Sequence, residues 1–224
     1  MKINDSILIY NSPSAEGPEQ SSFINPNSVY DGYLAAKTNE NTTDFSNILN
    51  GTYNADKYTY AGTTHYRYPE CKQSDLQEIN GIKVHPKCAE NFIKMQKDAR
   101  KEGVSLNIIS GFRSINYQKT VFAKKFIDKK NPTPEEMKKR IKFSAPPGFS
   151  EHSTGLAIDI NSLEQSFQNT KEYEWLLKNA GNYGFELSFS KNNSQNLGFE
   201  PWHWRYVGDE ESKKTFEKAR TENI

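Results

Sequence analysis

Two separated segments of the chain contain histidines and acids at spacings that suit metal binding. Residues 150–159, SEHSTGLAID, contribute His152 and Asp159, and residues 200–203, EPWH, contribute His203. Imidazole nitrogens and carboxylate oxygens are zinc ligands. Three protein ligands leave a fourth position for water, whereas a structural site is closed by a fourth Cys or His. The pattern therefore predicts a catalytic Zn²⁺ site held by His152, Asp159 and His203.

Hydrolysis at such a site also needs a group that takes a proton from water and passes it to the leaving group. Glu200 stands three residues before His203, on the far side of Pro201. The fixed φ of proline restricts the turn that enters the next segment. Glu200 is therefore the candidate general base and acid.

A plainer interpretation exists for each half of this pattern. A single buried histidine beside an aspartate is more often a hydrogen-bonded pair than a metal ligand. The chain contains four histidines, and two of them, His152 and His203, fall in these segments with an acid close in sequence. The combination favours metal binding over two unrelated pairs.

Short strands are expected to carry these ligands. Gly155 suits a turn, and the apolar run 156–160 indicates a buried strand, so His152 would lie at the turn and Asp159 on the strand. The aromatic and β-branched run 202–207 predicts a second strand that carries His203.

Motifs at three places resemble one enzyme family. Ser-x-His-x-x-Gly-x-Ala-x-Asp and the later Glu-Pro-Trp-His-Trp-Arg-Tyr resemble the VanY-type D-alanyl-D-alanine carboxypeptidases and the related L,D-carboxypeptidases, which are zinc peptidases of peptidoglycan stem peptides. Upstream, Ser110-Gly-Phe-Arg-Ser114 with Gln118 is similar to the family's Ser-Gly-Tyr-Arg-Ser segment, with Phe112 in place of the commoner Tyr. The resemblance covers about residues 79–208.

The resemblance implies roles for three further residues. It assigns Arg113 to the peptide end of the substrate or to the charge that develops at the scissile carbonyl, since a guanidinium can bind a carboxylate or an oxyanion through two donors. It makes Gln118 and Ser150 further polar contacts to the substrate. Taken by itself, Arg113 would be read as a surface salt bridge.

Length and charge limit the other function classes. The chain has 224 residues, with 29 basic and 28 acidic side chains and a net charge of +1. We expect one zinc carboxypeptidase domain over residues 69–224, preceded by a polar arm or linker over residues 1–68 whose tyrosines dock on that domain. The balanced charge argues against a nucleic-acid partner or an anionic membrane, and a monomer is expected.

The expected substrate lies outside the cytoplasm, so we expect an extracellular, cell-wall or periplasmic location. Yet no run approaches the roughly 18 apolar residues of a membrane span, and the first ten residues do not resemble a secretory signal. A trimmed sequence or another export route would explain this. Cys71 and Cys88 either form a disulfide or remain as two thiols, with Cys88 on the apolar face of the next helix.

Periodicity and capping signals predict helices and short strands that alternate irregularly. Pro86 begins a helix with an apolar stripe that ends at Gly103, and Thr133 begins a capping box. The other predicted helices cover 114–128, 170–181 and the segment after Asp209, and the other predicted strands cover 104–109 and 185–189. The fold class is α+β, a small antiparallel sheet with flanking helices and with the zinc site on the sheet in an open cleft.

The leading hypothesis is a carboxypeptidase that removes the C-terminal D-alanine from stem peptides, with D,D- or L,D-specificity left open. An endopeptidase of the endolysin type would use the same site on a different bond. A non-catalytic cell-wall-binding module on the same scaffold is a third hypothesis, which the presence of Glu200 disfavours because a binding module needs no base.

Overall fold

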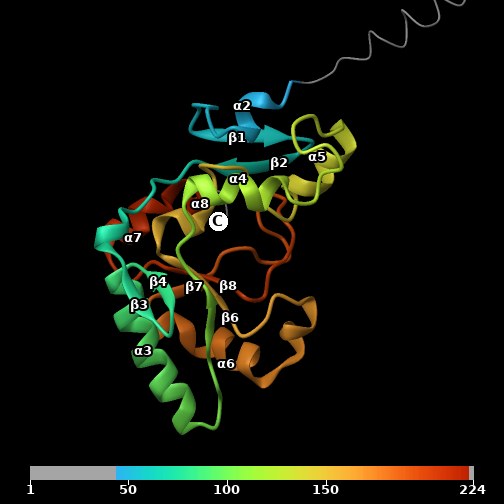
Figure 1. Ribbon diagram of the computed structural model, residues 1–224. Coiled ribbons are helices and arrows are strands. Elements are labelled where there is room, and N and C mark those ends of the chain that lie inside the picture. Colours follow the sequence, from blue (N-terminus) through green and yellow to red (C-terminus); the bar gives the residue numbers. More distant parts are fainter. Residues whose placement is uncertain (1–43, 222–224) are drawn as a thin grey trace, which may run out of the picture. The chain divides into compact units, whose positions relative to one another are not determined.

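The computed structural model describes residues 44–221 (Figure 1). Its α-helices are α2 (Ser46–Leu49), α3 (Pro86–Lys101), α4 (Ile115–Ala123), α5 (Pro134–Ile141), α6 (Lys171–Asn179), α7 (Glu210–Thr215) and α8 (Glu217–Thr221). Its strands are β1 (Lys57–Tyr60), β2 (Thr63–Tyr66), β3 (Gln77–Ile79), β4 (Ile82–Val84), β5 (Ile108–Ser110), β6 (Ala157–Ile160), β7 (Phe185–Leu187) and β8 (His203–Tyr206). The 3₁₀ turns are η1 (Gln73–Asp75), η2 (Glu151–Thr154), η3 (Gln165–Asn169) and η4 (Ala180–Tyr183).

A four-stranded antiparallel sheet with the order β5-β6-β8-β7 is the centre of the fold. β1–β2 and β3–β4 form separate antiparallel pairs. Asp159 on β6 lies directly opposite His203 on β8. Because side chains alternate between the two faces of a strand, Asp159 and His203 share one face, while their neighbours Ile158 and Trp204 lie on the other, in the hydrophobic core. The α+β class and the small antiparallel sheet are confirmed.

Helix α3 packs against this core through one buried face. Pro86 occupies the first turn, and the side chain of His85, the N-cap, accepts a hydrogen bond from the backbone of Lys87. The buried positions Cys88, Ala89, Phe92, Met95 and Ala99 recur at spacings of one to four residues on one side of the helix. The predicted start and apolar stripe are therefore confirmed, and His85 lies at the entry to the helix.

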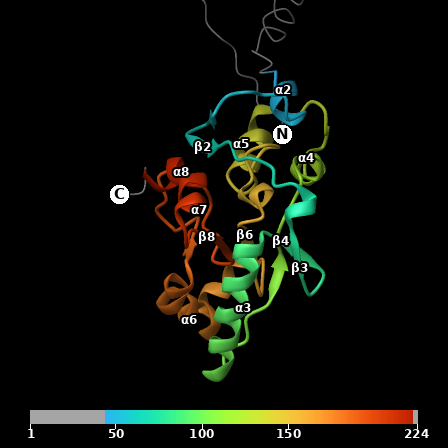
Figure 2. The same cartoon turned by 90° about the vertical axis from the view of Figure 1, so that its left-hand side faces the viewer.

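Residues 44–68 differ from the irregular segment expected there. They contain α2 and the β1–β2 hairpin, and Figures 1 and 2 both show these elements beside α4 and α5. Phe45, Ile48 and Tyr58 are buried in a second hydrophobic cluster with residues of α4 and α5. Tyr66 and Tyr68 are buried in the main core. Docking of these tyrosines was expected, but the regular structure was not.

Several predicted elements are shorter than expected. Of the predicted strand 104–109 only residues 108 and 109 belong to β5, which ends at Ser110, and α4 ends at Ala123 rather than near residue 128. The capping box at Thr133 is present in full, with both reciprocal hydrogen bonds to Glu136. The caps at Thr170 and Asp209 are also present.

Cys71 and Cys88 are free thiols in the structure, and Cys88 is fully buried on the apolar face of α3. Of the two alternatives for this pair, the structure shows the reduced one. Within residues 44–221, no helix is long and apolar enough to cross a membrane. The part of the predicted arm formed by residues 1–43 lies outside the described residues.

Candidate metal centre and active site

A tight turn brings the first two candidate ligands together. Residues 151–154 form η2, which ends at Gly155 with a φ of 69°, in the left-handed region. β6 begins two residues later and carries Asp159. A Cβ at Gly155 would lie 2.9 Å from Leu76 Cδ2 and 3.0 Å from the backbone nitrogen of His85. Glycine is therefore required at this turn both by its backbone angle and by the space available.

The structure brings His152, Asp159 and His203 together. Their ligand atoms lie within 4.8 Å of one another, and all three side chains are buried. His152 Nε2 is 3.3 Å from Asp159 Oδ2, and His203 Nδ1 is 3.0 Å from Asp159 Oδ1. The two imidazole rings are perpendicular, with centroids 4.8 Å apart. This is the set of residues that the spacing of the two segments predicted.

The hydrogen bonds behind the two imidazoles show which nitrogens are free to bind a metal. His152 Nδ1 is 2.7 Å from the carbonyl oxygen of Gly111, which can only accept, so Nδ1 carries the proton. The Nε2 lone pair of neutral His152 then points toward an Asp159 oxygen. His203 Nε2 is hydrogen bonded to Glu151 in the same manner, which leaves Nδ1 on the side of Asp159. Two imidazole nitrogens and a carboxylate oxygen thus converge, and this donor set fits a divalent metal ion once the proton that His203 donates to Asp159 is released.

Glu151 orients His203 from behind and was not among the predicted site residues. Its carboxylate accepts hydrogen bonds from His203 Nε2 (3.0 Å), Ser188 Oγ (2.6 Å) and Arg205 Nη1 (2.7 Å). Tyr68 donates a fourth, at 3.3 Å. Burial alone would raise the pKa of Glu151, but the charge of Arg205 and the hydrogen bonds from His203 and Ser188 lower it to about 2. A carboxylate that fixes the outer nitrogen of a metal-binding histidine is a recurrent second layer around zinc.

The pKa values of the three candidate ligands reflect their close contact. Burial lowers the pKa of His203, but hydrogen bonds to Asp159 and Glu151 outweigh it and raise this pKa to about 10. Burial raises the pKa of Asp159, and the charges and hydrogen bonds of the two histidines bring it well below its usual range. Burial lowers the pKa of His152. Near pH 7 Asp159 is thus an anion, His152 is neutral, and His203 carries a proton that metal binding would release.

Glu200 lies beside this group, in the same cavity. One of its carboxylate oxygens is 3.9 Å from His203 Nδ1, and its side chain is 18% exposed. Burial raises its pKa to about 7, although the charge of His203 opposes the shift. A carboxyl group that titrates near neutral pH can both accept and return a proton at that pH. The position and pKa of Glu200 are therefore suited to the role predicted for it.

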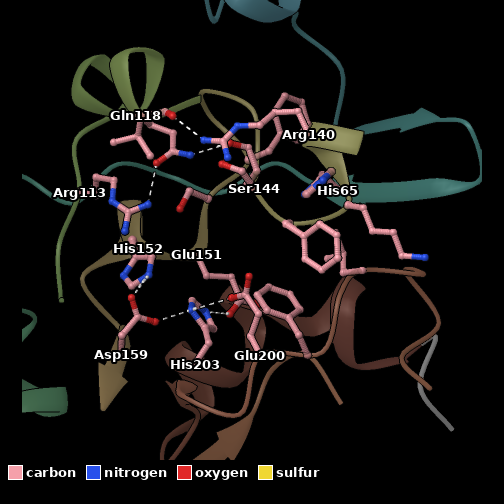
Figure 3. Close-up of a pocket in the computed structure, with 18 of the residues that line it drawn as sticks. His65, Arg113, Gln118, Arg140, Ser144, Glu151, His152, Asp159, Glu200 and His203 are labelled. Carbon is pink, nitrogen blue, oxygen red and sulfur yellow. Dashed lines mark hydrogen bonds and ion pairs between the residues drawn. The ribbon is translucent and has the colours of Figure 1, made fainter. Parts of the chain in front are cut away.

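Arg113 and Gln118 lie on another wall of the same cavity (Figure 3). The backbone nitrogen of Arg113 donates to the carbonyl of His152, which ties Arg113 to the first ligand. Its guanidinium donates to Gln118 Oε1 (3.0 Å) and Ser110 Oγ (3.3 Å). The other end of the Gln118 amide donates to the carbonyl of Ala145 at 2.6 Å. Ser150 is buried and also lines the cavity.

The cavity has a volume of about 320 Å³. Besides the predicted residues, side chains that no sequence motif indicated also line it: His65, Lys125, Arg140, Lys142, Phe143, Glu151, Leu163 and Phe189. His65 comes from β2, so the segment before residue 69 contributes to the cavity. Its Nε2 is 2.7 Å from the carbonyl of Ile141. All seven predicted site residues lie in this one cavity.

Three convergent ligands with a carboxyl group of raised pKa beside them, on one face of a small antiparallel sheet, define the site of a mononuclear metal-dependent hydrolase. The family model of VanY, D-alanyl-D-alanine carboxypeptidase, matches residues 81–209. The chain therefore belongs to the VanY family.

Individual relatives and solved structures agree with this assignment. The chain is 34% identical to YodJ of Bacillus subtilis over 153 residues, 65% of this chain and 54% of YodJ. It is 33% identical to a D-alanyl-D-alanine carboxypeptidase of Enterococcus faecium over 132 residues, 58% of this chain and 39% of that protein. The chain thus spans about half or less of the length of these relatives.

Two solved structures share the fold. A mutant of the vancomycin resistance D,D-pentapeptidase VanY, solved in complex with Zn(II), matches with a TM-score of 0.52 and 30% identity, covering 66% of this chain and 88% of that one. The LdcB LD-carboxypeptidase matches with a TM-score of 0.53 and 28% identity, covering 76% of each chain.

Proposed function

We propose that this protein is a zinc carboxypeptidase that removes the C-terminal D-alanine from peptidoglycan stem peptides outside the cytoplasm. The observation that carries the proposal is the convergence of His152 Nε2 and His203 Nδ1 on the carboxylate of Asp159, with Glu200 in the same cavity. The family supplies the substrate class, because its model is that of a D-alanyl-D-alanine carboxypeptidase. The related structure with Zn(II) supports the choice of metal.

His152 Nε2, His203 Nδ1 and an oxygen of Asp159 would hold the zinc ion. When bound, zinc lowers the pKa of a water at its open position and polarises a carbonyl oxygen. Glu200 takes a proton from the attacking water and delivers it to the leaving amine, so that the new C-terminus and free D-alanine form. Glu151 and the Gly111 carbonyl keep both imidazoles in the tautomer that leaves the inner nitrogen free.

Arg113 is the candidate group for the oxyanion or for the terminal carboxylate of the substrate. Its guanidinium is held in place by Gln118 and Ser110 and has no acidic partner within residues 44–221. Gln118 and Ser150 are buried in the same part of the cavity and supply further polar contacts. We assign the catalytic residues to the region 69–224, and residues 44–68 pack against this region.

Two variants separate chemistry from metal binding. Glu200→Gln is expected to keep stoichiometric zinc and to lose hydrolysis by about 10²–10⁴-fold, because only the proton transfer is removed. His203→Ala is expected to lose both zinc and hydrolysis. Zinc is measured by metal analysis of the purified protein, and hydrolysis by mass spectrometry of muropeptides with tetrapeptide and pentapeptide stems.

The same digest distinguishes the rival functions. Release of a single D-alanine supports the carboxypeptidase, whereas release of a larger peptide would indicate an endopeptidase. Binding to muropeptides without cleavage by the zinc-loaded wild-type protein would indicate a wall-binding module. A Glu200→Gln variant that retains near wild-type rates would show that another group is the base.

A further inference from the structure

The two sides of the active-site cavity carry opposite charges. Figure 3 shows Glu151, Asp159 and Glu200 around the two histidines at the metal end, the guanidinium of Arg113 next to His152, and that of Arg140 farther away, beyond Gln118. Lys125 and Lys142 also line the cavity. Within residues 44–221, no carboxylate lies within 4.0 Å of any of these four cations, whereas the three acids face the metal ligands or Arg205. The cavity therefore offers positive charge that no side chain of the described region neutralises.

Arg140 is the most enclosed of the cations that the proposed mechanism does not use. It stands in the last turn of α5, and its Nε and Nη2 donate to the carbonyls of Phe122 (2.8 Å) and Val121 (2.5 Å) at the end of α4. These carbonyls, at the C-terminal end of α4, and the Phe122 ring, 5.7 Å away, offset part of its positive charge, but no carboxylate of the described region pairs with it. An anionic ligand in the cavity would therefore complete the compensation of this charge.

The acids near Arg140 are engaged elsewhere. Glu135 lies 3.6 Å from Lys139, and Glu136 caps the start of α5 through Thr133. Neither carboxylate lies within 4.0 Å of Arg140, Lys125 or Lys142. The name "cationic wall" is used below for the three residues Lys125, Arg140 and Lys142.

Burial distinguishes the deep part of the cavity from its mouth. Gln118, Phe149 and Ser150 are buried, whereas Lys125, Lys142 and Phe143 are exposed, with Phe143 58% exposed. A carboxypeptidase places the C-terminal residue in the closed part and lets the rest of the peptide leave through the mouth. The cationic wall therefore faces the part of the peptide on the N-terminal side of the scissile bond.

We propose that the cationic wall selects stem peptides whose side chain on the N-terminal side of the scissile bond carries a free carboxylate, and that it disfavours side chains that present only an ammonium group. The proposal rests on the proposed function and names its substrate class. A carboxyl-bearing diamino acid in the stem fits this wall. Lysine, or a diamino acid whose side-chain carboxyl group is amidated, would place an ammonium group without a neighbouring carboxylate against it.

The expected size of the effect follows from the Coulomb law. At a separation of about 8 Å, one pair of unit charges changes an equilibrium about twofold in bulk water and about thirtyfold at the effective dielectric of a protein surface. Three cations act in the same direction. A preference of at least about tenfold for an acidic over an ammonium side chain is therefore expected at low salt, with a smaller preference at high salt.

The test uses two peptide series, acyl-X-D-Ala and acyl-X-D-Ala-D-Ala, with X as 2-aminoadipate, norleucine or lysine, which have similar length. The zinc-loaded full chain is assayed with the series that it cleaves faster, and the neutral norleucine peptide provides the reference rate. The wild-type order of kcat/KM is expected to be acidic, then neutral, then ammonium. The double variant Lys125→Glu/Lys142→Glu is expected to reverse it, and Arg140→Gln is expected to lower the acidic-to-ammonium ratio at least threefold.

Lys178→Gln is the control, because Lys178 is an exposed lysine of α6 that pairs with Glu174 and does not line this cavity. It should leave the ratio unchanged. A purely structural role of Arg140 would lower the rates on all three peptides together and leave the ratio intact, which would overturn its part in the selection. Equal wild-type rates on the three peptides would overturn the whole inference while the proposed function stands.

Failure of the proposed function gives a different result. The wild-type protein would then cleave neither series, and the inference would be judged from equilibrium binding of the same three peptides to the zinc-loaded protein. Tighter binding of the acidic peptide, lost in Lys125→Glu/Lys142→Glu, supports it. Equal binding of all three peptides overturns it.

Discussion

Replacement of Glu151 should weaken zinc binding although Glu151 is not itself a ligand. Its carboxylate holds His203 Nε2 at 3.0 Å, and it also accepts hydrogen bonds from Ser188, Tyr68 and Arg205. In Glu151→Gln the shape is kept, but the amide group must turn a donor toward at least one of these donors. The tautomer and orientation of His203 are then no longer fixed.

The magnitude follows from the contacts that are lost. Loss of an outer carboxylate partner of a metal-binding histidine weakens the metal about 10–100-fold, equivalent to about 1.4–2.8 kcal/mol. Glu151→Ala should have a larger effect on folding, because it removes the more deeply buried of the two carboxylates, Glu151 and Glu186, that lie 2.7 Å from the guanidinium of Arg205. Breaking a buried ion pair in this way costs about 3–5 kcal/mol of unfolding free energy.

Zinc affinity is measured by competition with a chromophoric chelator, and stability by urea unfolding of the metal-free protein. Glu186→Gln is the matched control, because Glu186 also binds Arg205 (2.7 Å) but is not hydrogen bonded to His203. It should change stability without changing zinc affinity. A wild-type zinc affinity in Glu151→Gln would refute the argument that this carboxylate positions His203.

Two further predictions concern folding. Burial lowers the pKa of His65 from 6.5 to about 4. The unfolded chain therefore binds the proton more tightly than the folded chain, and the free energy of unfolding falls as the pH drops from about 6.5 toward 4. The pKa shift corresponds to a loss of about 3 kcal/mol at most. His65→Gln should flatten this part of the pH dependence measured by urea unfolding, and an unchanged slope would contradict the assignment to His65. Gly155→Ala should lose about 2 kcal/mol or more and weaken zinc binding, because it adds left-handed strain and a contact of 2.9 Å with Leu76. Gly81→Ala is the control, since its φ is 83° but a Cβ would meet nothing within 4 Å, and equal losses in the two variants would show that strain alone decides.

Local sequence signals predicted the parts of the fold that local physics controls. Pro86, Thr133, Thr170 and Asp209 mark helix starts that the structure contains, because each supplies a proline in the first turn or a side chain that caps a backbone N–H. The three candidate ligands were recognised because their spacing is fixed by one turn and one pair of strands.

Features that depend on distant contacts could not be read from the sequence. Glu151 stands beside His152, yet its function depends on Ser188, Arg205 and Tyr68, which reach it only through the folded chain. Residues 44–68 are polar and their strands have four residues each, so their packing on α4 and α5 left no periodic signal. Arg140 stands among lysines in the sequence and belongs to no motif, although its side chain is held against the cavity.

The pairing of Asp159 with His203 across β6 and β8 has a consequence for how this scaffold can diversify. Directly opposed residues in an antiparallel pair keep their Cβ atoms about 4.5–5.5 Å apart through backbone hydrogen bonds alone. The backbone pairing of β6 with β8 therefore sets the distance between two of the three proposed metal ligands before a metal ion binds. The loops that border the cavity can change in length or in charge to bind a different peptide, while the proposed metal ligands keep their geometry.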